Sequence, residues 1–374
     1  NKMFDIGHIS LNYKFSNLVQ GTNINLDAIY IDSAQIFFTR IIEHDSISNL
    51  NINVFINQIN KQYSSGKKKT GGSSKINIGE AVIEKSQFIY DNTGRDSLTG
   101  FDYNHFALKI DEAQLRNFMA LGDTVEFNVN TLVAQDQKTK FGIHNLSSFF
   151  RISQKALEFR DIHLQAGKSV ISDTLVFNYE SQADLSDFVR KVNIQAHFDK
   201  TIIHPSDLAL FAPATRRLSE PLTISGEFNG SISDFRLKDM EIQSGNTVLL
   251  GSLDMEGLPD LKETFIQLSL KNSRVSFSDL SFLFSEPTLD RLTPLGTLSM
   301  NAEFLGYPTD FVAKGNFSNR LGLISSDINL KINEDAFEKS SYKGQISLAN
   351  FDLGTYLADT VNFQKLNLDG RISG

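Results

Sequence analysis

The sequence contains no cysteine and no tryptophan, only 7 prolines, and no long run of apolar residues. Without cysteine the chain can form neither disulfides nor thiolate zinc sites, and it has no cysteine nucleophile. No stretch of about 18 apolar residues occurs, so no transmembrane helix is predicted. A transmembrane barrel, whose aromatic girdles usually include tryptophan, is also disfavoured.

Motifs of known chemistry are missing as well. No GxSxG, GxGxxG or Walker pattern occurs, and none of the seven histidines has a second histidine at metal-binding spacing. We therefore predict no catalytic, cofactor-binding or metal-binding residue, and a protein that is not an enzyme. The net charge of −8 gives no electrostatic footprint for nucleic acid.

The 374 residues are 40% hydrophobic and include 30 Phe and 9 Tyr, which is enough for a folded core. Apolar and polar residues alternate with period two along most of the chain, as in residues 125–129, 192–198, 266–270, 298–304 and 328–332. Strands with one apolar and one polar face indicate antiparallel sheets covered on one side only. The sequence predicts an all-β fold, an elongated, curved antiparallel sheet that forms a repeating β-groove with a few short helices.

Helical patterns are few. Residues 53–63 and 111–119 are predicted helices, and single turns are predicted at residues 206–208 and 278–280, each beginning with a possible Ser cap. Residues 64–75, rich in Gly, Ser and Lys, are predicted to form a flexible loop.

Internal repeats are the strongest organising signal. Residues 160–171 align without a gap with residues 238–249, and each copy predicts a strand, a Gly-containing tight turn and a returning strand. The pair Asp207-Leu208 recurs at Asp279-Leu280 and again at Asp352-Leu353, and residues 31–38 are echoed by residues 83–90.

Repeats of about seventy residues predict sheet units stacked end to end. We expect β-groove units at residues 1–63 (ending in the short helix), 76–158, 159–236, 237–310 and 311–374, with the loop 64–75 after the first. The chain begins at Asn1 without an initiator Met and ends in a strand-like segment, so we expect an internal fragment of a longer protein.

Three stretches of the sequence look familiar: residues 24–34, residues 210–213 running on to 225–230, and residues 342–348 continuing through 350–354. They resemble the TamB and AsmA-like family of the bacterial envelope. It implies a periplasmic β-groove anchored in the inner membrane of a Gram-negative bacterium, phospholipid as cargo, and an outer-membrane barrel partner of the Omp85 type. The family's anchoring helix and C-terminal domain have no counterpart in this sequence.

We therefore expect a segment of a bridge protein that carries phospholipid acyl chains in an open apolar groove and supports outer-membrane biogenesis. The candidate groove residues are Leu222, Ile224, Phe228, Ile266, Leu268, Leu298, Met300, Phe304, Ile328, Leu330, Ile346 and Leu348. Two alternatives stay open. One is a scaffold for outer-membrane β-barrel proteins that uses sheet edges for strand addition. The other is a structural β-solenoid or adhesin whose apolar side chains fill a closed core.

Overall fold

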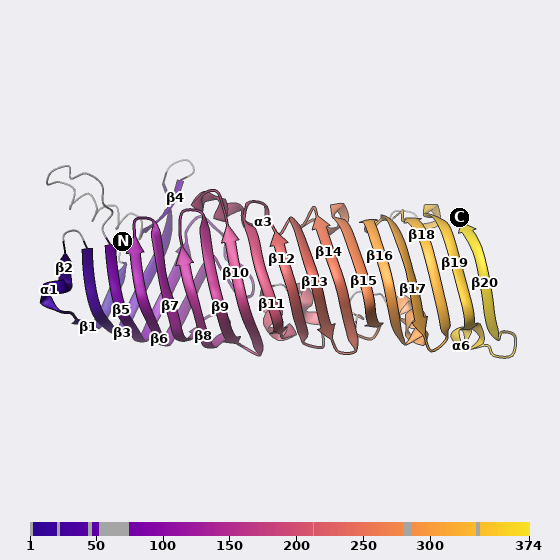
Figure 1. The fold of residues 1–374 in the computed structure, drawn as a ribbon, viewed down its shortest axis with the longest axis horizontal. Helices are drawn as coiled ribbons and strands as arrows, with labels where there is room; N and C mark the ends of the chain where they lie inside the picture. Colours follow the sequence, from indigo (N-terminus) through magenta and orange to yellow (C-terminus); the bar gives the residue numbers. More distant parts are fainter. Residues whose placement is uncertain are drawn as a thin grey trace. The chain divides into compact units, whose positions relative to one another are not determined.

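The computed structural model describes residues 3–20, 23–43, 47–51, 75–211, 213–279, 281, 286–333 and 337–374. These residues form strands with a few short helices (Figure 1). The strands pair antiparallel, as the alternation predicts, except for one parallel pair, β3 with β5. They divide into two compact units. Unit 1 comprises Asn1–Thr174 and Ser206–Ala214, and unit 2 comprises Leu175–Pro205 and Thr215–Gly374. The predicted helix at 53–63 and all but the last residue of the predicted loop at 64–75 lie outside the described residues.

Unit 1 is built mainly of strands. They are β1 (Phe4–Asn12), β2 (Val19–Gln20), β3 (Asn23–Glu43), β4 (Ile47–Leu50), β5 (Lys75–Asn92), β6 (His105–Leu121), β7 (Thr124–Asp136), β8 (Gly142–Ile152), β9 (Ala156–Ala166) and β10 (Ser169–Asn178), which continues into unit 2. Among the described residues of unit 1, helices form at α1 (Phe15–Leu18) and α4 (Pro205–Phe211). Strand β3 pairs with β1 and β5, and from β5 to β9 each strand pairs with the next.

The two copies of the repeat at residues 31–38 and 83–90 lie in neighbouring strands. Strands β3 and β5 pair in parallel, and their register places Ile31 opposite Ile83 and Gln35 opposite Gln87. Equivalent residues of the two copies therefore lie side by side. The Asn77 side-chain amide donates to Asn25 Oδ1 at 2.7 Å, which is the kind of ladder that identical residues form when strands stack in register.

One predicted helix is wrong. Residues 111–119 belong to strand β6, which pairs with β5 on one side and β7 on the other. Apolar residues at Leu115, Phe118 and Met119 have helical spacing in the sequence. The spacing arises instead from a bulge, because the register with β7 shifts between Arg116 and Met119, and Asn117 adopts φ 54°.

Unit 2 contains the remaining strands, each paired antiparallel with the next. They are β11 (Asn193–Ile203), β12 (Leu222–Gly230), β13 (Asp234–Ser244), β14 (Thr247–Glu256), β15 (Phe265–Ser276), β16 (Thr297–Tyr307), β17 (Asp310–Asn319), β18 (Gly322–Lys331), β19 (Ser341–Asp352) and β20 (Lys365–Ser373). Within this unit the strands follow one another in sequence order, from β11 to β20 (Figure 1).

The helical segments of unit 2 are short. The described residues include α3 (Phe188–Lys191), α5 (Glu286–Leu292), α6 (Leu353–Leu357) and 3-10 turns at Gln182–Asp187, Leu261–Glu263, Thr293–Leu295 and Phe337–Lys339. A further turn, Pro213–Arg217, spans the boundary between the units. Figure 1 shows α6 at the end of β19 and β20. None of these elements is long, and no residue of α5 is buried. Among the described residues, no helix has the length and apolarity needed to cross a membrane.

Regular bulges bend the strands of unit 2. Lys200, Asp239, Asn272 and Asn350 have φ between 46° and 52°, and each lies at a shift in the pairing register. A bulge bends its strand and increases the local twist. The backbone N–H that leaves the ladder finds a side chain instead: Asn272 N–H donates to Asn301 Oδ1 at 2.8 Å, and Asn350 N–H donates to Asn367 Oδ1 at 2.8 Å.

Candidate functional site

One side of the unit 2 sheet collects apolar side chains from β12 to β20. Directly opposed residues of an antiparallel pair project to the same side of the sheet, so the register identifies the members. One row consists of Phe228, Leu237, Leu253, Leu268, Phe304, Ala313, Ile328, Gly344 and Ile372. A second consists of Phe235, Met255, Ile266, Gly306, Phe311, Leu330 and Tyr342. We call the side chains on this side the apolar face of unit 2.

All twelve residues predicted from the sequence project to this face. Phe228, Ile266, Leu268, Phe304, Ile328 and Leu330 belong to the two rows above. Leu222 and Ile224 precede Phe228 at alternate positions of β12, and Leu298 and Met300 do the same before Phe304 in β16. Ile346 opposes Ser326, and Leu348 opposes Ile324, two and four residues before Ile328 on β18.

The apolar face is neither sealed nor fully open to water. In β16 Leu298 is buried, with 8% of its surface exposed, whereas Met300, Ala302 and Phe304 are partly exposed. Side chains packed between two sheets would lose nearly all of their accessible surface. The partial burial therefore reflects contact with neighbours in the same sheet, with one side of each side chain left accessible.

Burial increases where the strands bend. Leu237, Met240 and Leu270 form a buried cluster, and Phe228, Ile242, Leu249, Leu253, Leu268 and Met300 pack against it. The cluster adjoins the bulges at Asp239 and Asn272. Bending of the strands there brings side chains of the apolar face closer together than a flat sheet would.

Several members of the face are absent from the prediction. Leu237 and Met240 lie three residues apart in β13, so simple alternation assigns them to opposite sides. The bulge between them restores both to one side. The sequence signal for this bulge was the repeat, which aligns Lys238-Asp239 with Arg160-Asp161. In the structure both aspartates have positive φ, 51° at Asp161 and 46° at Asp239.

A repeated aromatic pair lines the face. The rings of Phe228 and Phe235 are 4.8 Å apart, and those of Phe304 and Phe311 are 4.6 Å apart. In both copies the second phenylalanine opposes a glycine, Gly230 or Gly306. An aromatic ring beside a strand glycine fills the space that the missing side chain leaves.

Unit 1 has an apolar side of a more aromatic kind. Phe118, Phe127, Phe150 and Phe159 form a file across β6 to β9, with successive ring centroids 5.9, 4.7 and 5.3 Å apart. A second group joins Phe38, Phe88, Tyr90 and Phe106. Near it Ile110, Ala113 and Ala134 are buried.

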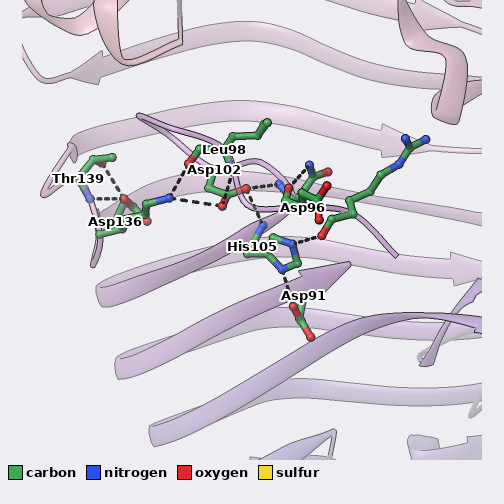
Figure 2. Close-up of polar contacts among 10 residues, drawn as sticks. Asp91, Asp96, Leu98, Asp102, His105, Asp136 and Thr139 are labelled. Atoms are coloured by element: carbon green, nitrogen blue, oxygen red, sulfur yellow. Dashed lines mark hydrogen bonds and ion pairs between the residues drawn. The ribbon is translucent and has the colours of Figure 1, made fainter. Parts of the chain in front are cut away.

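The most connected polar group of unit 1 surrounds Asp102 and His105 (Figure 2). Asp102 is 2% exposed and accepts hydrogen bonds from the backbone N–H groups of Leu98, Asn104 and His105, with Lys138 Nζ 3.4 Å from its Oδ2. Burial alone would raise the pKa of Asp102, but the three N–H groups and Lys138 together lower it. The arrangement holds a carboxylate in place and leaves it no free oxygen directed toward a substrate.

Unit 2 also has a polar hollow of about 710 Å³. Charged residues of both signs line it, including Arg190, Glu227, Arg236, Lys238 and Asp254. Arg236 already makes two 2.9 Å contacts with the Asp254 carboxylate. Across the described part of the chain, no group of three or more His, Asp or Glu residues could hold a metal ion.

No protein-family model, no curated protein and no solved structure matches this chain.

Proposed function

We propose that this chain is a segment of a periplasmic bridge protein that carries phospholipid acyl chains along the apolar face of its sheet. The observation that supports this proposal is the set of apolar rows that runs from β12 to β20, most of whose members remain partly exposed. A soluble domain with a closed core would bury such side chains between two layers.

The energetics favour a continuous apolar track over a specific polar site. Each CH₂ group transferred from water gains about 0.8 kcal/mol, so exposing both chains of a phospholipid costs on the order of 20 kcal/mol. A single polar contact contributes only about 1 kcal/mol. A row of aliphatic and aromatic side chains offers similar affinity at successive positions, which suits movement along the sheet and requires no chemistry.

The cellular location and the partners that we propose for this chain are those implied by its resemblance to the TamB and AsmA-like family. We place the segment in the periplasm of a Gram-negative envelope, anchored to the inner membrane by a part of the protein outside this sequence. An outer-membrane barrel protein of the Omp85 type would be its partner at the other membrane.

Two adjacent residues of β16 give a matched test. Phe304 projects to the apolar face, whereas Leu305 projects to the opposite side and is 46% exposed. A photo-crosslinking amino acid at position 304 should capture phospholipid in cells, and the same probe at position 305 should not. The purified chain should also carry phospholipid in native mass spectrometry.

Three results would contradict the proposal. Equal lipid capture at positions 304 and 305 would mean that the face has no special role. Capture of unfolded outer-membrane proteins at position 304 instead of lipid would favour the scaffold function. Normal lipid transfer by Phe228→Glu or Met300→Arg, with Leu305→Glu as the control, would remove the support for a track.

A further inference from the structure

Residues 93–104, which join β5 to β6, contact aromatic residues of unit 1 through Phe101. Phe101 of this segment has its ring 5.7 Å from Phe106 and 5.2 Å from Phe211 of α4. Its backbone N–H donates to the carbonyl of Leu210 at 2.9 Å. Because Phe106 also contacts Phe88 and Tyr90, Phe101 packs against the end of the aromatic group of unit 1. We call residues 93–104 the strap.

His105, the first residue of β6 after the strap, has a hydrogen-bond partner at each ring nitrogen (Figure 2). Nδ1 lies 2.6 Å from Asp91 Oδ1, and Nε2 lies 2.7 Å from the carbonyl oxygen of Arg95. A carbonyl oxygen can only accept, and so can an ionised carboxylate. The side chain of Asp91 is 46% exposed. Both contacts are therefore satisfied together only when the imidazole carries two protons.

The charged surroundings favour this protonated form. The hydrogen bond to Asp91 raises the pKa of His105 above its ordinary value of 6.5, and the Arg95 carbonyl and the charges of Asp102 and Asp91 raise it further, against the opposing effect of burial. From the turn between β7 and β8, Lys138 donates to the Leu98 carbonyl at 2.7 Å and also contacts Asp102. Asp136 of the same turn accepts from Thr139.

We propose that the strap is a pH-operated cover, closed over the aromatic group of unit 1 while His105 is protonated and loosened when His105 loses its proton. A neutral imidazole can donate from only one nitrogen, so one tether, to Asp91 or to Arg95, is lost. The pKa in the folded state lies above the unfolded value, so the stabilising effect is complete below pH 6.5 and is lost as the pH rises through the folded pKa. The proposal is independent of what the apolar faces bind.

Amide hydrogen exchange of the full chain tests the proposal. The N–H groups of Leu98, Phe101 and Asn104 are hydrogen-bonded in the closed strap. Their protection factors, corrected for intrinsic exchange, should fall about tenfold between about pH 5.5 and about pH 8.5, with a midpoint that matches the titration of His105 followed by NMR. In His105→Gln, protection should be low at both pH values, whereas the exposed-histidine control His163→Gln should behave as wild type.

A second variant keeps the proposal testable if His105→Gln does not fold. Asp91→Asn removes the partner that most favours the imidazolium, so the midpoint of strap protection should move to lower pH together with the His105 titration. Wild-type protection that is equal on both sides of the His105 titration would overturn the proposal. An unchanged midpoint in Asp91→Asn would do the same.

Discussion

The carboxylate of Asp207 accepts a 2.7 Å hydrogen bond from the hydroxyl of Ser169, and the same oxygen accepts another of 2.7 Å from the backbone N–H of Lys168. The arrangement recurs in unit 2, where Asp279 Oδ2 accepts from the Asn246 N–H at 2.7 Å and from Thr247 Oγ1 at 3.1 Å. In each copy, therefore, the aspartate of the repeated Asp-Leu pair accepts hydrogen bonds from the turn of the hairpin that precedes it.

Removing this aspartate should destabilise the sheet more in the first copy than in the second. Asp207 is buried, at 8% exposure, whereas Asp279 is partly exposed. We expect Asp207→Ala to lower the free energy of unfolding by about 2–3 kcal/mol and Asp279→Ala by about 1–2 kcal/mol. Urea unfolding of the full chain measures both. Asp327→Ala, at an exposed position of β18, is the control, and an equal effect of all three variants would contradict the proposed role.

Glycines of the apolar face differ in how well they should tolerate a side chain. Gly230 and Gly306 adopt φ of 132° and 136°, and a Cβ at these positions would lie 2.6 Å from Phe235 Cα and 2.7 Å from Phe311 Cα, respectively. Gly370 has no atom within 4 Å of its Cβ position. We expect Gly230→Ala and Gly306→Ala to destabilise the chain by about 1–3 kcal/mol and Gly370→Ala to be neutral or slightly stabilising. Thermal unfolding distinguishes these outcomes, and an equal loss of stability in all three variants would contradict the prediction.

The buried carboxylate of Asp102 should make the stability of unit 1 depend on acid pH. Its pKa is lowered below the ordinary value of 3.8, because hydrogen bonds to the ionised form outweigh burial. The stabilising effect is therefore present above pH 3.8 and is lost as the pH falls through the folded pKa. Unfolding measured over acid pH should show this loss in wild type and a weaker dependence in Asp102→Asn. An identical pH dependence in the two proteins would exclude Asp102 as a source of acid sensitivity.

Much of the fold could be predicted where strands run without interruption. Residues 298–304 alternate cleanly, and all of their apolar members project to one face. The ungapped repeats at 160–171 and 238–249 correctly predicted hairpins, β9–β10 and β13–β14. Period-two patterning is a local property of the chain, so a sequence alone can reveal it.

Period-two alternation does not show where a strand carries a bulge. At Asn117 the extra residue made part of β6 look helical, and at Asp239 it concealed the fact that Leu237 and Met240 share a side. A bulge exists only in relation to a partner strand, so its position depends on pairing as well as on local sequence.

By itself, the sequence determined that this protein is built of repeating strands with one apolar and one polar side. The alternation of apolar and polar residues and the repetition of segments are properties of the order of residues along the chain. The tertiary structure decided which residues meet: Ile31 beside Ile83, Asp207 against Ser169, and His105 between Asp91 and the Arg95 carbonyl. Those contacts join residues distant in the chain, and their geometry arises only when strand register and bulges bring them within hydrogen-bonding distance.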